Sequence, residues 1–327
     1  MTRIKIIVHC LVKNEERFIW YAIKSVLPFV DKIMVWDTGS TDKTIQIIKS
    51  IKSKKISLSV IPSHPLVIPS VVEGSLSTVN LPATGIPPLE DSVGMTERRI
   101  LGRNDSRKSF SAQEHTKLRQ QMLDQTPKEF TWLMILDGDE IWPTKSIKKT
   151  TQYIRKNPQT DSVVVRTHNL VGDIYHRLPE SAGHYQIAGH KGHLSLRFIN
   201  LKNTPGLCVK KPHGQQGYFD GQGTLIQDRD PKKIKFIDVY YHHATHLQRS
   251  ATKSADRQVT KRAQKLKHQL GKKISKTQIP KVFFKSHPKI VPSVTLKAPL
   301  SFWLKSILLT PLRYTKRLLL PVNTSGY

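Results

Sequence analysis

The chain has little cysteine and little negative charge for its size. Two cysteines among 327 residues cannot form a multi-bridge disulfide framework, which fits a reducing, cytoplasmic location. Only 24 Asp and Glu stand against 53 Lys and Arg, so the net charge is +29 at pH 7. This scarcity of acids favours polyanionic partners, such as phosphate-bearing substrates, anionic lipid headgroups or nucleic acid, without choosing among them.

Several sequence signatures are also missing. The apolar start IKIIVHCLV runs directly into KNEER with no small-residue cleavage site, so we expect a first strand there rather than a signal peptide. The sequence has no HExxH, no paired-cysteine zinc pattern, no Ser-His-Asp signature and no P-loop. These absences argue against the zinc, serine-hydrolase and P-loop chemistries that such motifs support.

The first sixty residues alternate strand and helix signals. Residues 4–12 are apolar and β-branched, as in a buried strand, and residues 32–36 form a second such run. Residues 14–27 have helical apolar spacing, and another helix is expected to begin near Asp42. The β-α-β-α order predicts an α/β fold. We expect a Rossmann-like, mostly parallel sheet with helices on both faces, then a mixed strand and loop region and a basic helical tail.

A proline-rich stretch interrupts this pattern. Six of the 20 prolines fall between residues 60 and 88, and the tetrapeptide VIPS occurs twice, at 60–63 and 67–70. Neither a helix nor a central strand tolerates that density of proline. We therefore predict a repeat-derived, largely disordered insertion over residues 60–105, with a lid or recognition loop as the alternative.

Regular patterns resume beyond the insertion. The run TWLMIL at 131–136 predicts a strand that leads into the acidic turn DGDE at 137–140. The region 168–246 is rich in loop and strand signals and holds nine of the 14 histidines. The other expected elements are helices near 113–123 and 145–156 and strands at 162–167, 194–199 and 233–241.

The last quarter of the chain is strongly basic. From Ala251 onward it has 17 Lys and Arg and a single acid, Asp256. Residues 301–320 mix Trp, Phe and Leu with Lys and Arg, and charge interrupts them too often for a bilayer span. They suit a helix lying in an anionic membrane interface, or a helix packed on the preceding domain. The predicted organisation is one domain at 1–59 and 106–247, followed by a basic extension at 248–327.

The DGDE turn carries the clearest chemical signal. A strand that ends in Asp137-Gly138-Asp139 places two carboxylates at the carboxyl edge of a parallel sheet, where open α/β folds bind ligands. Carboxylate oxygens suit Mg²⁺ or Mn²⁺, which keep further positions for water and substrate phosphates. An isolated D-x-D is more often a solvated turn. Here two other strands also end in polar turns, KNEE at 13–16 and DTGSTD at 37–42, and all three should share one edge.

These turns resemble a known family. The segment HCLVKNEERFIWYAIKSVLPFVDKIMVWDTGSTDKT, residues 9–44, is similar to the N-terminal half of the nucleotide-binding domain of family-2 glycosyltransferases. Members of that family have the GT-A fold and carry an N-E-E turn and a D-x-GS-x-D-x-T turn. The helix HTKLRQQML before TWLMILDGDE is similar to the family's Arg-bearing helix before its D-x-D strand. The resemblance covers about 100 of the first 143 residues, where the nucleotide-binding half would end.

The resemblance implies a hexosyltransferase-like enzyme. It would transfer a sugar, with inversion, from a nucleotide-diphosphate sugar to an acceptor hydroxyl, with a metal ion assisting the departure of the diphosphate. We expect a UDP-sugar as donor, a glycan or lipid-linked molecule as acceptor, and a place in glycan or cell-envelope polysaccharide synthesis. The basic tail would allow peripheral attachment to the inner face of the plasma membrane.

The resemblance also implies roles for individual residues. Asp137 would face the ribose or sugar, and Asp139 would bind the Mg²⁺ or Mn²⁺ that bridges the diphosphate, with Asp137 as a second ligand. Asp42 instead suits the start of a helix, where its charge complements the helix dipole. The remaining nucleotide-sugar contacts would be Lys13, Asn14, Glu15, Asp37 and Arg119.

An inverting transfer also needs a base to take the acceptor's proton. In related family members a carboxylate after a second-half strand, often in a His-Glu pair, looks like that base. Here His213 is followed by Gly214 and not by Glu, so the base stays open among Asp220, Asp173 and His213.

A late histidine often completes the metal site in GT-A enzymes. The segment YHHATHLQRS at 241–250 has three histidines directly after a predicted strand, and by position His243 is the expected metal ligand. A surface or core histidine is the alternative interpretation for each of them.

Other protein classes remain as alternatives. An inactive, degenerate homologue fits the insertion and the missing Glu. A haloacid-dehalogenase-like phosphatase normally has its D-x-D on the first strand, and a sugar nucleotidylyltransferase has a glycine-rich loop that VKNEE lacks. A nucleic-acid-binding protein would explain the charge, but the basic tail lacks a regular aromatic interleave, so no nucleic-acid partner is expected.

Overall fold

The computed structural model describes residues 3–61, 111–183, 185–212, 215–259 and 262–318. Almost all of the insertion predicted at 60–105 lies outside the described residues, and so does His213. Among the described residues, no helix is both long and apolar enough to cross a membrane.

The first half of the chain builds a parallel sheet, as predicted. Its strands β1 (Ile6–Val12), β2 (Lys32–Asp37), β3 (Ile56–Val60) and β4 (Trp132–Ile135) lie side by side in the order β3-β2-β1-β4. All three pairings are parallel. The sequence prediction missed β3, whose residues are half-buried or exposed at the end of the sheet, so its apolar signal is weak.

The second half extends the same ten-stranded sheet in mixed fashion. Strand β10 (Leu194–Asn200) runs antiparallel between β4 and β6 (Ser162–Val171), and β13 (Ile234–His243) pairs parallel with β6. Strand β5 (Glu140–Ile141) pairs antiparallel with the end of β13. The remaining members of the sheet are β7 (Asp173–Arg177) and β14 (Lys272–Lys273).

Two short hairpins complete the strand and loop region that the sequence predicts. They are β8 (Tyr185–Ile187) with β9 (His190–Gly192), and β11 (Cys208–Lys210) with β12 (Gly217–Phe219). Single 3₁₀ turns accompany them at Glu180–Ala182 and Ile226–Asp228.

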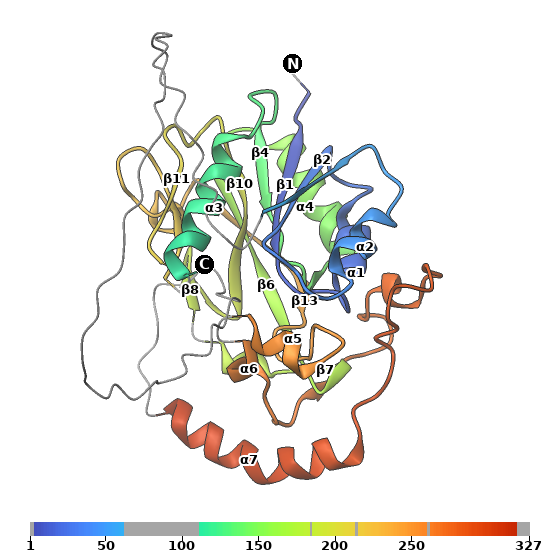
Figure 1. The fold of residues 1–327 in the computed structure, drawn as a ribbon. Helices are drawn as coiled ribbons and strands as arrows, with labels where there is room; N and C mark the ends of the chain where they lie inside the picture. Colours follow the sequence, from blue (N-terminus) through green and yellow to red (C-terminus); the bar gives the residue numbers. More distant parts are fainter. Residues whose placement is uncertain (1–2, 62–110, 184, 213–214, 260–261, 319–327) are drawn as a thin grey trace, which may run out of the picture.

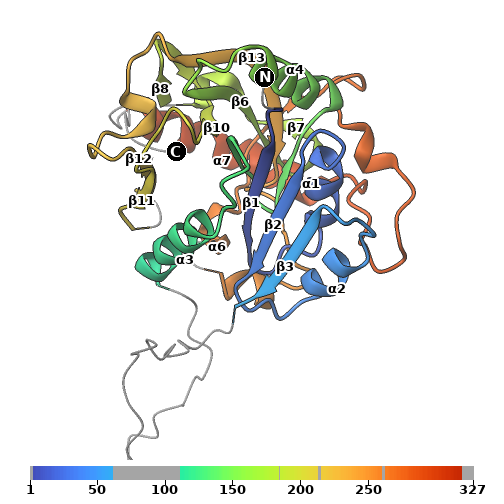
Figure 2. The same cartoon turned by 90° about the horizontal axis from the view of Figure 1, so that it is seen from above.

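Helices cover both faces of the sheet, and this confirms the predicted α/β class. One face carries α1 (Ile19–Val26), α2 (Thr44–Lys49) and α4 (Thr144–Lys156), and the other carries α3 (Ala112–Asp124). Figure 2 shows α3 on one side of strands β1 to β3 and α1 and α2 on the other. Because successive strand residues point to opposite faces, β1 contributes alternate side chains to two hydrophobic cores.

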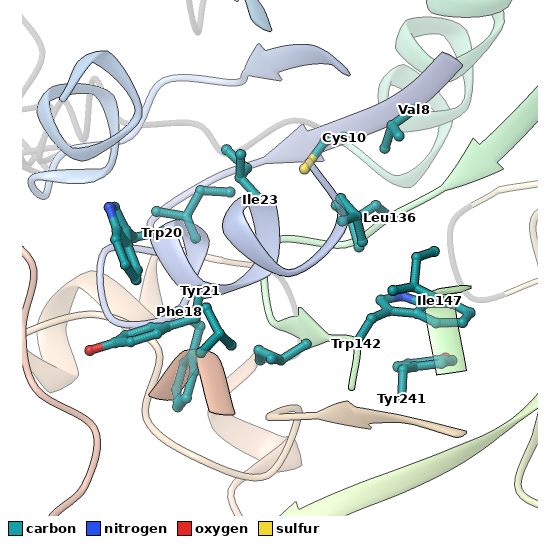
Figure 3. Close-up of a cluster of buried hydrophobic side chains, with 14 of the residues drawn as sticks. Val8, Cys10, Phe18, Trp20, Tyr21, Ile23, Leu136, Trp142, Ile147 and Tyr241 are labelled. Carbon is teal, nitrogen blue, oxygen red and sulfur yellow. The ribbon is translucent and has the colours of Figure 1, made fainter. Parts of the chain in front are cut away.

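The larger core lies under α1. Ile23 of this helix lies near Cys10 of β1, whereas Tyr21 points away from β1 and packs on Phe283, and Trp142 stacks on Tyr241 (Figure 3). Dense apolar packing fixes the ends of the strands at this point of the sheet. The polar turns that follow these strands are therefore held in fixed positions.

The basic C-terminal segment, predicted as an extension from residue 248, packs on the same core as α1. Ile274, Ile279, Val282 and Phe283 are buried in the same core as α1, and a 3₁₀ turn at Lys281–Phe284 packs on that helix. These apolar residues are spread among lysines, so charge hid them in the sequence. The helices of the segment are α5 (Lys253–Arg257), α6 (Arg262–Lys265) and α7 (Leu300–Leu318), which lie along the lower edge of the molecule in Figure 1.

Candidate functional site

The three polar turns lie together at the carboxyl edge of the sheet. Val12 at the end of β1 is in register with Asp37 at the end of β2, and the Leu136 N–H donates to the His9 carbonyl beside them. Strand β13 is parallel to β6, and β6 is parallel to β4 because β10 is antiparallel to both. The carboxyl end of β13, with His243, therefore reaches the same edge.

Asp137, Glu140 and His243 form a group that could hold a metal ion. Each offers one ligand atom, and these atoms lie within 4.8 Å of one another. The short pairing of β5 with β13 creates the group, because it sets Glu140 directly opposite His243. Two carboxylates and an imidazole fit Mn²⁺, and the carboxylates suit Mg²⁺ equally well. Sequence reasoning predicted Asp137 and His243 as ligands and missed Glu140.

Asp139, the other predicted metal ligand, is not part of that group. Its carboxylate is fully buried, with Oδ2 2.9 Å from Arg249 Nη1 and 3.4 Å from His243 Nε2. Burial raises the pKa of Asp139, but Arg249 and His243 outweigh it and hold that pKa well below its usual range. Asp139 is thus an ionised carboxylate that positions His243 and Arg249 beside the group.

An arginine lies against each of the two carboxylates of the metal group. Arg119 of α3 is 2.8 Å from Asp137, and Arg197 of β10 forms an ion pair with Glu140. Burial would raise the pKa of Asp137, yet the two arginines hold it at about 2, whereas burial dominates for Glu140 and raises its pKa to about 7. We call Asp137, Glu140, Arg119 and Arg197 the strand cluster. Its two arginines come from α3 and β10.

A second set of ion pairs uses arginines of the C-terminal segment. Arg249 lies 3.2 Å from Glu15, and Arg262 pairs with both Glu15 and Asp256. Burial raises the pKa of Glu15 to about 7 although both arginines oppose it. We call this set, together with Asp139, the tail cluster: Glu15, Asp139, Asp256, Arg249 and Arg262.

Two of the predicted nucleotide contacts have their side chains engaged inside the protein. Asn14 is buried with φ 54°, accepts a hydrogen bond from Thr41 N–H at 2.7 Å and donates to the Ala255 carbonyl at 3.0 Å. The carboxylate of Asp37 is buried and accepts from the N–H groups of Gly39 and Ser40 at 3.0 and 2.8 Å. Both side chains shape the turns that line the edge.

The other predicted positions are resolved in similar detail. Lys13 stays half-buried, and burial lowers the pKa of its ammonium. Asp42 accepts the N–H of Thr44, the first residue of α2, at 3.0 Å, in agreement with its predicted place at the helix start.

The predicted base candidates lie in different places. Asp220 accepts from Gln222 and Thr224 N–H groups and pairs with Arg229, which also pairs with Asp161 just before β6. That contact places Asp220 at the amino edge of the sheet, opposite the acidic turn.

Asp173 lies at the carboxyl end of β6, on the same edge as His243. Its carboxylate accepts from Tyr175 and Ala298 N–H groups and is 2.7 Å from Nδ1 of His176. The structure therefore brings Asp173 to the correct edge and does not bring Asp220 there.

Three arginines of the site escaped sequence reasoning. Arg262 lies in a stretch where lysine and arginine are so frequent that no single one stands out, whereas Arg249 stands alone between Lys235 and Lys253 and was overlooked beside the neighbouring histidines. Arg197 left a signal, since it is a charged residue in the middle of the apolar strand run LSLRFIN, and a buried charge needs a partner.

No protein-family model and no curated protein sequence match the chain. Among solved structures, the chain is similar to glucosyl-3-phosphoglycerate synthase from Mycobacterium tuberculosis in complex with phosphoglyceric acid, at 15% identity over 74% of this chain and 72% of that one, with a TM-score of 0.38. The same enzyme with Mn²⁺, uridine diphosphate and phosphoglyceric acid gives 15% identity, 74% and 70% coverage and a TM-score of 0.38.

A third similar structure is 4-diphosphocytidyl-2C-methyl-D-erythritol synthase from Anaerococcus prevotii. It is 11% identical over 77% of this chain and 92% of that chain, with a TM-score of 0.34. These likenesses are too distant to indicate an activity, so the function has to be inferred from the site itself.

Proposed function

We propose that this chain is a metal-assisted, inverting glycosyltransferase of the GT-A, family-2 type. It uses a nucleotide-diphosphate sugar, with a UDP-sugar as the expected donor, and an acceptor hydroxyl on a glycan or lipid-linked molecule in glycan or cell-envelope synthesis. One observation carries the proposal: Asp137, Glu140 and His243 converge at the carboxyl edge of the sheet, beside two further polar turns. Ligands of open α/β folds bind at that edge.

In the proposed site the metal group consists of Asp137, Glu140 and His243, with Asp139 holding His243 in place. When bound there, Mg²⁺ or Mn²⁺ would supply positive charge to offset the charge that builds on a leaving diphosphate. Arg249, whose guanidinium lies between Asp139 and Glu15, holds these two carboxylates beside the metal group.

The nucleotide would lie along the turns after β1 and β2. The half-buried Lys13 would contact phosphate, while Asn14 and Asp37 would support the binding surface by fixing the turn backbones. Arg119 and Glu15 act through their ion pairs, which orient Asp137 and Arg249 respectively.

For the acceptor proton we propose the pair of Asp173 and His176. Of the described candidates, Asp173 is the one at the correct edge, and its carboxylate orients the imidazole through a 2.7 Å contact at Nδ1. A carboxylate that fixes the tautomer of a histidine leaves Nε2 as the basic nitrogen. His176 would then take the proton, and Asp173 would be its positioning residue.

The proposal is tested by nucleotide-sugar binding with and without Mn²⁺. We expect UDP-sugar affinity that requires the metal and that Asp137→Asn lowers by at least ~10-fold, because one metal ligand is lost. Glu129→Gln serves as the matched control, since Glu129 is an exposed carboxylate paired with Lys5 at the amino edge.

Three outcomes decide the matter. Metal-dependent binding with sugar transfer supports the enzyme. Metal-dependent binding without transfer to any acceptor or water supports an inactive homologue. If the affinities for UDP-, GDP- and dTDP-sugars change neither with Mn²⁺ nor with Asp137→Asn, the glycosyltransferase assignment is wrong.

A further inference from the structure

Helix α7 turns an apolar face to the solvent. Leu304, Leu308 and Leu312 are 56, 74 and 67% exposed, and they recur every four residues on one side of the helix. Leu300 and Ile307 extend the same face and are also more than half exposed. An ordinary surface helix directs such a stripe toward the core. We call these five residues the α7 stripe.

The orientation of α7 is fixed by contacts on its opposite side. Ser306 is fully buried, and the hydroxyl of Thr310 accepts the Leu270 N–H at 2.9 Å. Phe302 packs on His268 at 4.9 Å between ring centroids, and Trp303 meets the ring of His176 at 4.5 Å. With its polar and aromatic side anchored on the domain, the helix cannot bury the stripe by rotating in place.

Positive charge surrounds the stripe. Residues 257–327 contain 16 Lys and Arg and no Asp or Glu. Lys297, just before α7, and Lys305, within it, are exposed near the stripe. Lys272 and Lys273 are also exposed and form β14, close in sequence to Leu270, which contacts Thr310 of α7. A second copy of this chain would bring the same positive charge to the contact and be repelled, whereas anionic lipid headgroups would be attracted.

We propose that the α7 stripe and its basic rim bind an anionic phospholipid bilayer. The helix would lie in the plane of the interface, with the leucines among the upper acyl segments and the lysines at the headgroups. This mode suits a helix that is not apolar enough to cross a membrane.

The attachment also sets the direction in which the site faces. Phe302 lies against Gly172, in the turn that follows the carboxyl end of β6, and this is the sheet edge that carries His243 and the acidic turn. Membrane-bound α7 would hold that edge next to the bilayer (Figure 1). If the proposed function holds, the acceptor would be a lipid-linked molecule presented at the membrane surface. This step alone rests on the proposed function.

The test is co-sedimentation of the full chain with vesicles of phosphatidylcholine alone or mixed with phosphatidylglycerol. We expect binding to the anionic vesicles, weakened by salt, and a roughly 10-fold or larger loss in the double variant Leu304→Gln/Leu308→Gln. The matched control is Phe284→Gln, which removes an apolar side chain that is 57% exposed outside α7. Circular dichroism checks that each variant keeps its fold.

Two results would overturn the proposal. One is binding to anionic vesicles that the double variant leaves unchanged. The other is a wild-type dimer without vesicle binding that the double variant converts to a monomer, because the stripe would then cover a second copy. Vesicle binding is measured without any donor sugar, so a chain that binds vesicles but turns over no nucleotide sugar would count against the proposed function alone.

Discussion

The strand cluster and the tail cluster contain the same chemical groups but differ in what they connect. In the strand cluster, Arg119 and Arg197 come from elements of the sheet domain and pair with Asp137 and Glu140, which also face His243. In the tail cluster, Arg249 and Arg262 come from beyond β13. The first set leaves a group of ligand atoms that can converge on a cation, and the second ties the C-terminal segment to the turn after β1.

Neighbouring carboxylates of the acidic turn therefore have two different roles, ligand binding and attachment of the C-terminal segment. A buried ion pair seldom adds much net stability, yet losing one partner leaves an uncompensated charge in the interior. The tail cluster is therefore expected to be sensitive to single charge deletions in folding. In the strand cluster, Asp137 should respond chiefly in ligand binding because its side chain is still partly exposed, whereas Glu140 and Arg197 are as buried as the tail cluster.

The largest expected effect is on folding. Arg262→Met should lower the free energy of unfolding by about 3–5 kcal/mol, because Glu15 and Asp256 keep buried charge without this partner and the carbonyls of Lys13 and Asn14 each lose a donor. Urea unfolding measures it. Arg257→Met, an exposed arginine of the same segment, is the control. A loss below about 1 kcal/mol would show that the tail cluster does not hold the segment in place.

The second prediction separates the two clusters by metal affinity. Glu140→Gln should weaken Mn²⁺ binding by about 100-fold, while Asp139→Asn, which alters a residue behind His243, should weaken it by about 10-fold. Isothermal calorimetry with Mn²⁺ measures both. The reverse order would make Asp139 the direct ligand, as the resemblance to family-2 glycosyltransferases implies.

The third prediction concerns Gly138, which lies between the two clusters. A Cβ there would come within 2.8 Å of Cγ of Glu15 and 3.0 Å of Cγ1 of Val12. Gly138→Ala should therefore cost about 1–3 kcal/mol of unfolding free energy by overpacking. It should also loosen the alignment of the clusters, visible as weaker Mn²⁺ binding. Stability within about 0.5 kcal/mol of the wild type would mean that Glu15 moves freely away from the turn.

Sequence reasoning named two members of each cluster, Asp137 and Arg119 in the strand cluster and Glu15 and Asp139 in the tail cluster. Residues in and beside Asp137–Glu140 follow an apolar strand, so local pattern places them at the carboxyl edge. His243 could be placed because it ends a strand run. The β5–β13 pairing that sets Glu140 opposite His243 is a long-range contact between two residues and leaves no periodic signal.

The tail cluster depends on chain segments more than 200 positions apart. Arg262 reaches the Lys13 and Asn14 carbonyls across such a separation, and nothing local marks it among the other basic residues. The same masking hid Ile279 and Phe283, which tie the basic segment into the main core. Charge composition described the surface of this segment correctly but gave no hint of its interior.

The smallest expected effect is a pH dependence beside the strand cluster. Burial and, to a smaller extent, the nearby Arg119 guanidinium together lower the pKa of His9 to about 3. The unfolded chain binds a proton at this histidine near pH 6.5, whereas the folded chain does not until about pH 3. The His9 contribution is therefore fully present above pH 6.5 and is lost as the pH falls, by at most ~1.4 kcal/mol per unit.

His9→Gln should remove this slope. The amide can still hydrogen-bond to Thr126 Oγ1, which lies 2.9 Å from Nε2, so the variant keeps a partner while losing the titrating group. Urea unfolding at pH 7.5, 6.5 and 5.5 measures the difference between the two chains. Because Arg119 belongs to the strand cluster, Arg262→Met should leave the His9 slope unchanged. If Arg262→Met altered it, the charge of Arg262 would reach His9, and the assignment of the His9 shift to burial and Arg119 would fail.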